Sequence, residues 1–457
     1  MAFKVELELA GSTWTLDDKH ITVSDFTERL SLFGATPALS SASMEVMGLP
    51  LALLASQGHK IAGAVGRLYL DGDLLFTGTV SAPTYGAPTE PVFMSLREGA
   101  YQDTGLIPTA TERVSDETLS HFGTVEDDRK GLYYPVILGQ PGVYVPDTGL
   151  PVRATPAILG VETGTETIII ARGVLDVSSV QVWNDTTGLN ATLSLVTVAD
   201  GLGQTFTKAL APSAAWVSSG DELWAGYIDQ AGPSSVYDVS AYLLRLSSLK
   251  VDYGALVALR ALSWRTGSHI NVPTSPWGWL KTNILPYVPV SAISTPRGLA
   301  FVVHDLTPAL TEVAAALTQG TNAWRLTQVE IGSEDDVVND IVVQFAPDYK
   351  GVYRGEVQKT DERSVALYGR KTSVVKLSAT MHLNTAETTA TYLLRRDAYP
   401  TMDVEYLTTE TVTLGDLVRI DDPDVYFEDT LGWVTSRTIR SGLPTRVRIR
   451  LVPPATA

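Results

Sequence analysis

The 457-residue chain contains no cysteine, which excludes disulfides, thiolate metal sites and cysteine nucleophiles. Histidine is scarce, and its six positions lack the spacing of a zinc site or a serine–histidine–aspartate triad: His20, His59, His121, His269, His304 and His382. A nucleotide-binding P-loop, an HExxH zinc motif and a GxSxG nucleophile motif are also absent. We therefore expect no catalytic residue, no cofactor site and no metal site.

Long apolar runs are missing too, since no stretch approaches the roughly 18 residues needed to span a bilayer. The N-terminus alternates Lys4, Glu6 and Glu8 with apolar residues, which is typical of a strand and not of a signal peptide. Basic residues number 34 against 51 acidic ones, a net charge of −17. This charge argues against tight binding to nucleic acid or anionic membrane. We expect no membrane insertion, and this sign of charge is the one that a protein would need to let DNA pass without binding it.

The length favours two to four domains, and the many turn residues, 37 glycines and 25 prolines, favour short strands. Apolar residues alternate through most of 3–95 and again through 131–232. In "RLYLDGDLLFTGTV", Asp71-Gly72 predicts a tight hairpin turn, because both residues tolerate positive φ. Asp200-Gly201-Leu202-Gly203 predicts a second hairpin loop.

Helical patterns lie between and after these strands. Ser235 and Ser275-Pro276 are typical helix starts, and a second helical run is expected over 253–262. "SAISTPRGLAFVV" predicts a hairpin around residues 296–298. Three further helices are expected, as a short connector over 115–123, over Thr307 to Gly320, and after a cap at Thr385.

These patterns predict a mainly β fold with an α+β insertion, in which two similar small antiparallel β-barrels flank inserted β and α+β domains. The expected domains are a first β-barrel (1–100), a connector with an inserted β domain (101–232), an α+β domain (233–305), and a second β-barrel with associated helices (306–457). An internal echo supports the duplication: "GDLLFTGTVS" shares a Gly-Asp strand start and a Gly-x-Val strand with "GDLVRI" and "LGWVTS". The candidate structural residues in these hairpins are Asp71, Gly72, Gly78, Gly415, Asp416, Gly432 and Trp433.

Paired carboxylates are the remaining candidates for catalysis, because a glycosidase needs only two of them at a suitable separation. Three clusters occur where turns are expected, and a solvated loop is the simpler interpretation of each: Glu126-Asp127-Asp128, Glu334-Asp335-Asp336 and Asp421-Asp422-Asp424. The last cluster lacks the turn glycine of a calcium loop, and Pro423 breaks its spacing. Trp183, Trp216 and Trp224 could form a sugar-binding surface, although strand aromatics more often fill a core.

The order of several segments resembles the baseplate hub family of bacteriophage tails. In the C-terminal half these are "NDIVVQFAPD", "RSVALYGRK", "TAETTATYLLRRDAYP", "MDVEYLT" and "LGDLVRIDD". Earlier segments are similar as well: "LYLDGDLLFTGTVSAPTYG", "YYPVILGQPG", "YDVSAYLLRLSSLKVD", "WGWLKTNILPYVPVSAIS" and "RGLAFVV". The likeness covers most of the chain but little of 145–232, and it lies in the order of the segments and not in an active-site motif.

The resemblance implies a structural protein of the virion, located at the tail tip or baseplate and made in the host cytoplasm. Such hubs form homotrimers whose six barrels make a pseudo-six-fold ring around the DNA exit channel. The implied partners are a distal tail or tail tube protein, a tail fibre or spike protein, and the tape measure protein. Two alternatives stay open at this point: a tail-tip cell-wall hydrolase or depolymerase, and a receptor- or carbohydrate-binding module within 131–232.

Overall fold

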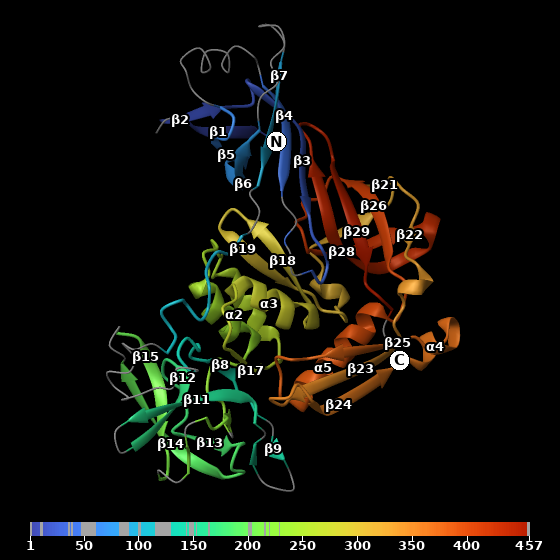
Figure 1. The fold of residues 1–457 in the computed structure, drawn as a ribbon. Helices are drawn as coiled ribbons and strands as arrows, with labels where there is room; N and C mark the ends of the chain where they lie inside the picture. Colours follow the sequence, from blue (N-terminus) through green and yellow to red (C-terminus); the bar gives the residue numbers. More distant parts are fainter. Residues whose placement is uncertain are drawn as a thin grey trace.

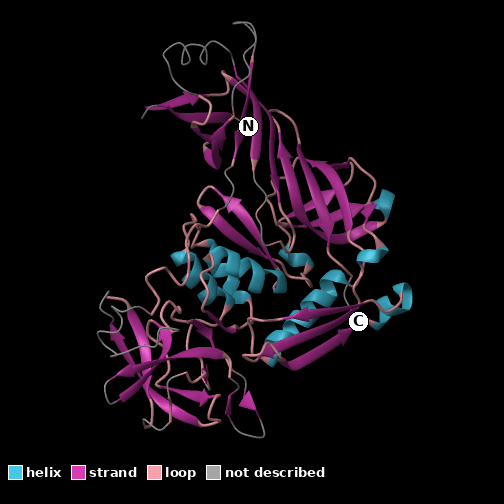
Figure 2. Ribbon diagram, in the orientation of Figure 1, coloured by secondary structure: helices cyan, strands magenta, loops and turns pink. Residues whose placement is uncertain are grey.

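The structure is a computed structural model. It describes residues 2–454, except 10–11, 35–36, 38–39, 47–60, 82–90, 99–101, 115–128, 143, 146–149, 152, 163–164, 200–202, 214–215, 219 and 228. Strands dominate; α2 and α3 lie in the middle of the molecule, and α4 lies at its right edge in this view (Figure 1, Figure 2). The predicted fold class, mainly β with an α+β insertion, is confirmed. No helix in the described ranges is long and apolar enough to cross a membrane.

The first β unit contains seven strands: β1 (Phe3–Leu9), β2 (Ser12–Leu16), β3 (Ile21–Arg29), β4 (Ser41–Val46), β5 (Val65–Leu70), β6 (Asp73–Val80) and β7 (Val92–Arg97). Side chains alternate between core and surface, so Val5, Leu7 and Leu9 of β1 are buried while Glu8 is exposed. Phe26 stacks on Phe76 in this core, with ring centroids 5.4 Å apart.

The second β unit is also built from seven strands: β20 (Ala315–Thr318), β21 (Ala323–Arg325), β22 (Glu330–Ile331), β26 (Met402–Thr408), β27 (Leu417–Asp422), β28 (Phe427–Ile439) and β29 (Thr445–Leu451). Its separate core includes Tyr406, Val418 and Val434. A 3-10 turn, η6 (Pro423–Val425), connects β27 to β28.

The predicted helix from Thr307 to Gly320 is wrong. Only a short 3-10 turn, η4 (Leu310–Glu312), forms, and β20 follows it as a strand parallel to β27. The segment "VAAALT" is rich in helix formers, but Leu317 fills the core of the second β unit, and the pairing with β27 satisfies the backbone of the segment. Tertiary packing therefore overrides the local helical preference.

The two β units share one 14-stranded sheet, because β3 of the first pairs with β28 of the second. Their strands run side by side in the blue and red parts of Figure 1. Among the described residues, full closure into a barrel is found in the inserted segment, where the strand order is β11-β12-β15-β14-β13-β16.

This inserted barrel consists of six strands: β11 (Thr155–Glu162), β12 (Thr165–Arg172), β13 (Ser179–Asn184), β14 (Asn190–Ala199), β15 (Thr205–Leu210) and β16 (Leu223–Gly226). A small two-stranded sheet, β9 (Tyr144–Val145) and β10 (Leu150–Pro151), precedes it. β14 and β15 form the predicted hairpin, but of its loop only Gly203 lies within the described residues.

The central α+β unit lies between the inserted barrel and the β units (Figure 1). It contains β8 (Val136–Gly139), α2 (Val236–Leu246), η2 (Ala255–Ala261), β17 (Gly267–Ile270), α3 (Pro276–Asn283), η3 (Leu285–Tyr287), β18 (Val290–Thr295) and β19 (Gly298–Val303). The predicted caps are confirmed, since the Ser235 and Ser275 hydroxyls accept hydrogen bonds from the backbone N–H groups of Asp238 and Gly278. The expected hairpin around residues 296–298 connects β18 to β19.

A sheet–helix unit completes the fold. It comprises η5 (Glu334–Asp336), β23 (Asp340–Pro347), β24 (Tyr353–Thr360), α4 (Glu362–Tyr368), β25 (Thr372–Lys376) and α5 (Leu383–Asp397). The predicted cap at Thr385 is wrong, because α5 begins at Leu383 and the Thr385 hydroxyl accepts a hydrogen bond from Arg265 N–H instead. The expected connector helix over 115–123 lies outside the described residues.

Candidate assembly surface

The Asp71-Gly72 turn joins β5 to β6 as predicted. Both residues have positive φ, 50° and 95°, which is the geometry of a two-residue hairpin turn. The Asp71 carboxylate also accepts a hydrogen bond of 2.7 Å from the backbone N–H of Ala2. The turn therefore fixes the start of β6, the strand that carries Gly78.

Gly415 and Asp416 form the turn that leads into β27. Gly415 has a φ of 82°, and a Cβ there would lie 2.8 Å from a methyl group of Val302, so the turn packs closely on the central α+β unit. The Asp416 carboxylate accepts hydrogen bonds from the backbone N–H and the hydroxyl of Thr413, at 2.7 and 2.9 Å.

Gly78 and Gly432 occupy equivalent positions in the two β units. A Cβ on Gly78 would lie 2.8 Å from the carbonyl oxygen of Arg97, and a Cβ on Gly432 would lie 3.0 Å from that of Arg450. The next residue in each strand, Thr79 or Trp433, is the register partner of that same arginine. Both glycines thus allow close approach of the neighbouring strand at the same point of a Gly-x-Val motif.

Strand order extends this equivalence across both units. The path β1-β5-β6-β7-β4-β3 in the first unit is matched by β20-β27-β28-β29-β26-β21 in the second. One pair differs, since β20 runs parallel to β27 whereas β1 is antiparallel to β5. In the second unit, the hydrogen bond from Gly320 N–H to the Ala323 carbonyl links the end of β20 to β21. The structure therefore contains two copies of one strand arrangement.

The seam between the units is formed by β3 and β28. Backbone pairing aligns Thr27 with Thr438, and their hydroxyls lie 3.2 Å apart. The buried Glu28 forms an ion pair with Arg437, and Leu30 N–H donates to the Thr435 carbonyl at 2.7 Å. A buried ion pair needs a specific geometry, so this pair helps to set the register of the seam.

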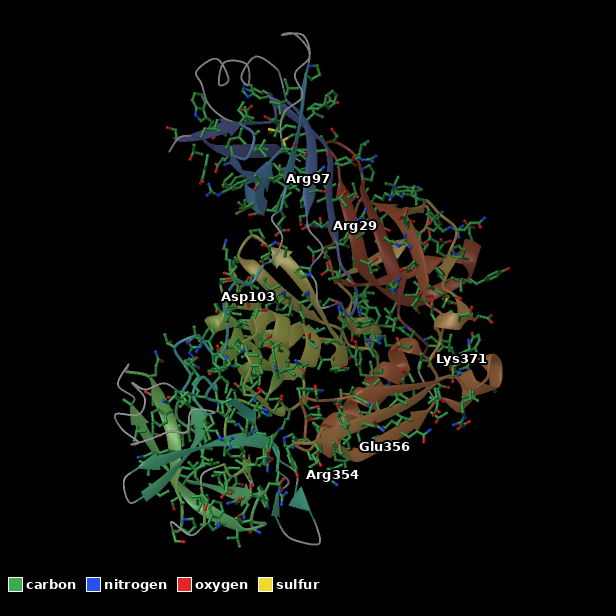
Figure 3. The ribbon with its side chains drawn as sticks, viewed as in Figure 1. Arg29, Arg97, Asp103, Arg354, Glu356 and Lys371 are labelled. Carbon is green, nitrogen blue, oxygen red and sulfur yellow. The ribbon has the colours of Figure 1, made fainter. Side chains whose placement is uncertain are left out.

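A polar groove of about 420 Å³ follows the outer face of the seam. Its charged residues are Asp25, Arg29, Glu405, Arg440, Arg446 and Arg448. Asp25 pairs with Arg440 and Glu405 with Arg446, while Arg29, labelled in Figure 3, has no ion pair with any described residue. The groove is therefore locally basic in a chain of net charge −17.

Trp433 points away from the core of the second β unit and into an aromatic cluster with Phe33 and His304. The Trp433 ring centroid lies 5.9 Å from Phe33 and 5.5 Å from His304, both edge to face. The Ser291 hydroxyl contacts His304 Nε2 at 2.8 Å and accepts a hydrogen bond from Phe33 N–H at 2.9 Å. Both β units are thus anchored to the central α+β unit at this cluster.

Burial lowers the pKa of His304 to about 4, because only 2% of the side chain is exposed and a charge there would be poorly solvated. His304 therefore stays neutral near neutral pH. Burial raises the pKa of the neighbouring Tyr392 to about 12, so its hydroxyl is neutral as well. The cluster is a junction between units that carries no charge of its own.

The carboxylate clusters do not form a catalytic pair in the described residues. Glu334, Asp335 and Asp336 lie exposed on η5. Asp422 belongs to a different element, β27, and Glu126-Asp127-Asp128 lie outside the described residues. The structure therefore shows no cleft in which two of these clusters converge within the described parts of the chain.

Asp422 corrects the expectation of a solvated acidic loop. Its side chain is fully buried, accepts a hydrogen bond of 2.9 Å from the Tyr406 hydroxyl, and lies 3.6 Å from Arg325 Nε. Burial, together with the bond to Asp422, raises the pKa of Tyr406 above its usual value. Asp421 and Asp424 are more exposed, so only they fit the solvated rim.

The three tryptophans considered for a sugar-binding surface pack against other parts of the chain. Trp183 and Trp216 are buried in the inserted barrel, and Trp224 contacts Tyr349 of the sheet–helix unit, with centroids 4.7 Å apart. Among the described residues, no group of three or more histidine or acidic side chains could hold a metal ion. His59 and His121 lie outside this part of the chain.

Searches of known proteins return structural neighbours only. No protein-family model matches the sequence, and no curated protein matches it. A tail protein from Neisseria meningitidis MC58 is 11% identical, with a TM-score of 0.45 over 99% of this chain and 97% of that one. The 43 kDa tail protein of prophage MuSo2 from Shewanella oneidensis is 10% identical, with a TM-score of 0.45 over 99% and 98%.

A prophage tail protein from Listeria monocytogenes EGD-e is also similar, at 10% identity and a TM-score of 0.44, over 98% of this chain and 94% of that one. All three of these structures are tail proteins by name, two of them from prophages. The identities near 10% and the TM-scores below 0.5 make each of these a distant likeness.

Proposed function

We propose that the chain is a structural hub of a phage tail, located in the virion at the tail tip. Three copies would form a ring in which six β units occupy near-equivalent positions. The ring would join a six-fold tail tube or distal tail protein to a three-fold fibre or spike, and it would surround the channel through which DNA leaves. The tape measure protein is a further proposed partner.

The duplicated β unit is the observation that carries this proposal. A ring closes only when each contact turns the next unit by the correct angle. One chain with two copies of the same strand arrangement, already joined edge to edge by β3 and β28, supplies two adjacent positions of such a ring. Three chains then match six-fold symmetry on one side and three-fold symmetry on the other.

The charge of the chain fits a channel for DNA. A net charge of −17 disfavours binding of the passing phosphates. A structural role also fits the absence of converging carboxylates in the described residues, and we propose that the chain itself turns over no substrate.

Electron microscopy tests the proposal. Gold-labelled antibodies against the chain should decorate the tail tip of intact virions, and class averages of the isolated assembly should show three-fold symmetry with six lobes. Labelling of the capsid or of the tail shaft alone would contradict the proposal.

A further inference from the structure

We propose that the free edge of the second β unit, at residues 329–333 around β22, binds the first β unit of a second copy of this chain. The proposal rests on the ring described above and names the contact that would close it. The occupant is Ser81, directly after β6, in the next copy.

The register of the strands shows which positions of the two units are equivalent. Arg97 pairs with Ser41, and Arg450 pairs with Asp403, so Ser41 and Asp403 are equivalent. Ser41 pairs in turn with Thr27 of β3, and Asp403 with Glu330 of β22. β21 and β22, which pair one after the other with the same edge of β26, therefore together occupy the position that β3 occupies in the first unit, with β22 matching the end of β3.

The two equivalent strands differ in what lies beyond them. The far side of β3 is covered by β28, which continues the sheet into the second unit. The far side of β22 pairs with no strand in the described part of the chain. The two units thus share one strand arrangement, but the edge that is paired in the first unit is free in the second, as far as the described residues show.

The open edge has the chemistry of a pairing site. Gly332 N–H donates to the Thr401 carbonyl within the sheet, and because N–H groups alternate along a strand, that of Ile331 points to the free side. Ile331 is 69% exposed, and Trp324 and Leu326, earlier on the same edge, are 39% and 43% exposed. An exposed apolar edge strand is a template for adding another strand.

The same equivalence identifies the segment that would bind there. Gly78 corresponds to Gly432, so Val80 and Ser81 correspond to Val434 and Thr435. In the seam, Leu30 N–H donates to the Thr435 carbonyl. Leu30 corresponds to Ser333, so Ser333 N–H of one copy is expected to donate to the Ser81 carbonyl of the next.

Charge complementarity supports this orientation. Glu334, Asp335 and Asp336 follow Ser333 directly and are exposed. Arg97, the register partner of Thr79, is also exposed and has no ion pair with any described residue (Figure 3). The contact would bring the three acids of one copy toward Arg97 of another.

The test uses the absence of native cysteine, which lets two introduced thiols report a single contact. The full-length double variant Ser81→Cys with Ser333→Cys, oxidised mildly, should form covalent dimers and trimers on a non-reducing gel. The matched control, Ser81→Cys with Leu443→Cys, places the second thiol at an exposed residue away from the edge and should stay at monomer mass.

A backbone variant gives an independent readout. Ile331→Pro removes the outward N–H and should shift the assembly to monomer, with at least a tenfold weaker association by sedimentation, whereas Ile331→Val keeps the N–H and should assemble as the native chain does. Circular dichroism of the monomeric Ile331→Pro variant should match that of the native chain, which separates a lost contact from a lost fold.

The outcomes separate the two proposals. If the native chain forms trimers, but Ser81 and Ser333 do not cross-link and Ile331→Pro still assembles, this contact is wrong and the ring stands. If the native chain stays monomeric at every concentration, the ring itself is contradicted, and the contact with it.

Discussion

His304 makes the junction between the units sensitive to acid. Its folded-state pKa is about 4, against about 6.5 for an exposed histidine. As the pH falls below 6.5, the unfolded chain takes up the proton first, so stability that is fully present above 6.5 is lost progressively toward pH 4. Single-site linkage puts the loss from pH 7.5 to pH 4.5 at about 2.5 kcal/mol.

The comparison of His304→Gln with the native chain isolates this effect, because an amide can still bond to Ser291 but does not titrate. Hydrogen–deuterium exchange of β19 and β28 peptides, corrected for intrinsic rates, gives the free energy of opening at both pH values. The native chain should lose about 2.5 kcal/mol more than the variant does on acidification. Tyr392→Phe, equally buried in the same cluster, should follow the native chain. Equal losses in native protein and His304→Gln would refute the reasoning.

Three further predictions concern stability, each measured by chemical or thermal unfolding. Gly78→Ala and Gly432→Ala should each lower the free energy of unfolding by about 1–3 kcal/mol, and by similar amounts, because each Cβ would crowd the carbonyl of an equivalent arginine. A large loss at only one of the two sites would contradict the duplication. Tyr406→Phe should cost about 1.5–3 kcal/mol, because it removes a donor to the buried Asp422; a neutral result would show that Asp422 finds another donor. Burial would raise the pKa of Asp340, but hydrogen bonds from neighbouring side chains outweigh it and hold the pKa at about 2. The native chain therefore has a stabilising contribution from Asp340 above pH 4 and loses it as the pH falls toward 2, and Asp340→Asn should remove that contribution. An unchanged acid transition in the variant would contradict this.

Local features of the fold could be predicted from the sequence because their causes are local. The Asp71-Gly72 turn follows from tolerance of positive φ, and the caps at Ser235 and Ser275 follow from a hydroxyl beside free N–H groups. The helix predicted over 307–320 was wrong for the opposite reason. Leu317 is held in a core formed by residues far from this segment in the sequence, so the segment alone does not show its structure.

The candidate assembly surface depends on contacts that no local pattern shows. Thr27 and Thr438 meet across the seam although 411 positions separate them. The cluster of Phe33, His304 and Trp433 likewise joins three distant segments. The repeated Gly-x-Val motif was the local signal of this arrangement. It is present in both units because the neighbouring strand lies so close at Gly78 and at Gly432 that a Cβ would crowd it.

The mass of the native assembly tests the central claim most directly. Native mass spectrometry of the full chain across a range of concentrations should find a species of three times the 49.2 kDa chain mass, with no stable dimer or tetramer. A chain that remains at 49.2 kDa throughout, or that assembles only as dimers or tetramers, would contradict a ring of three chains and six β units.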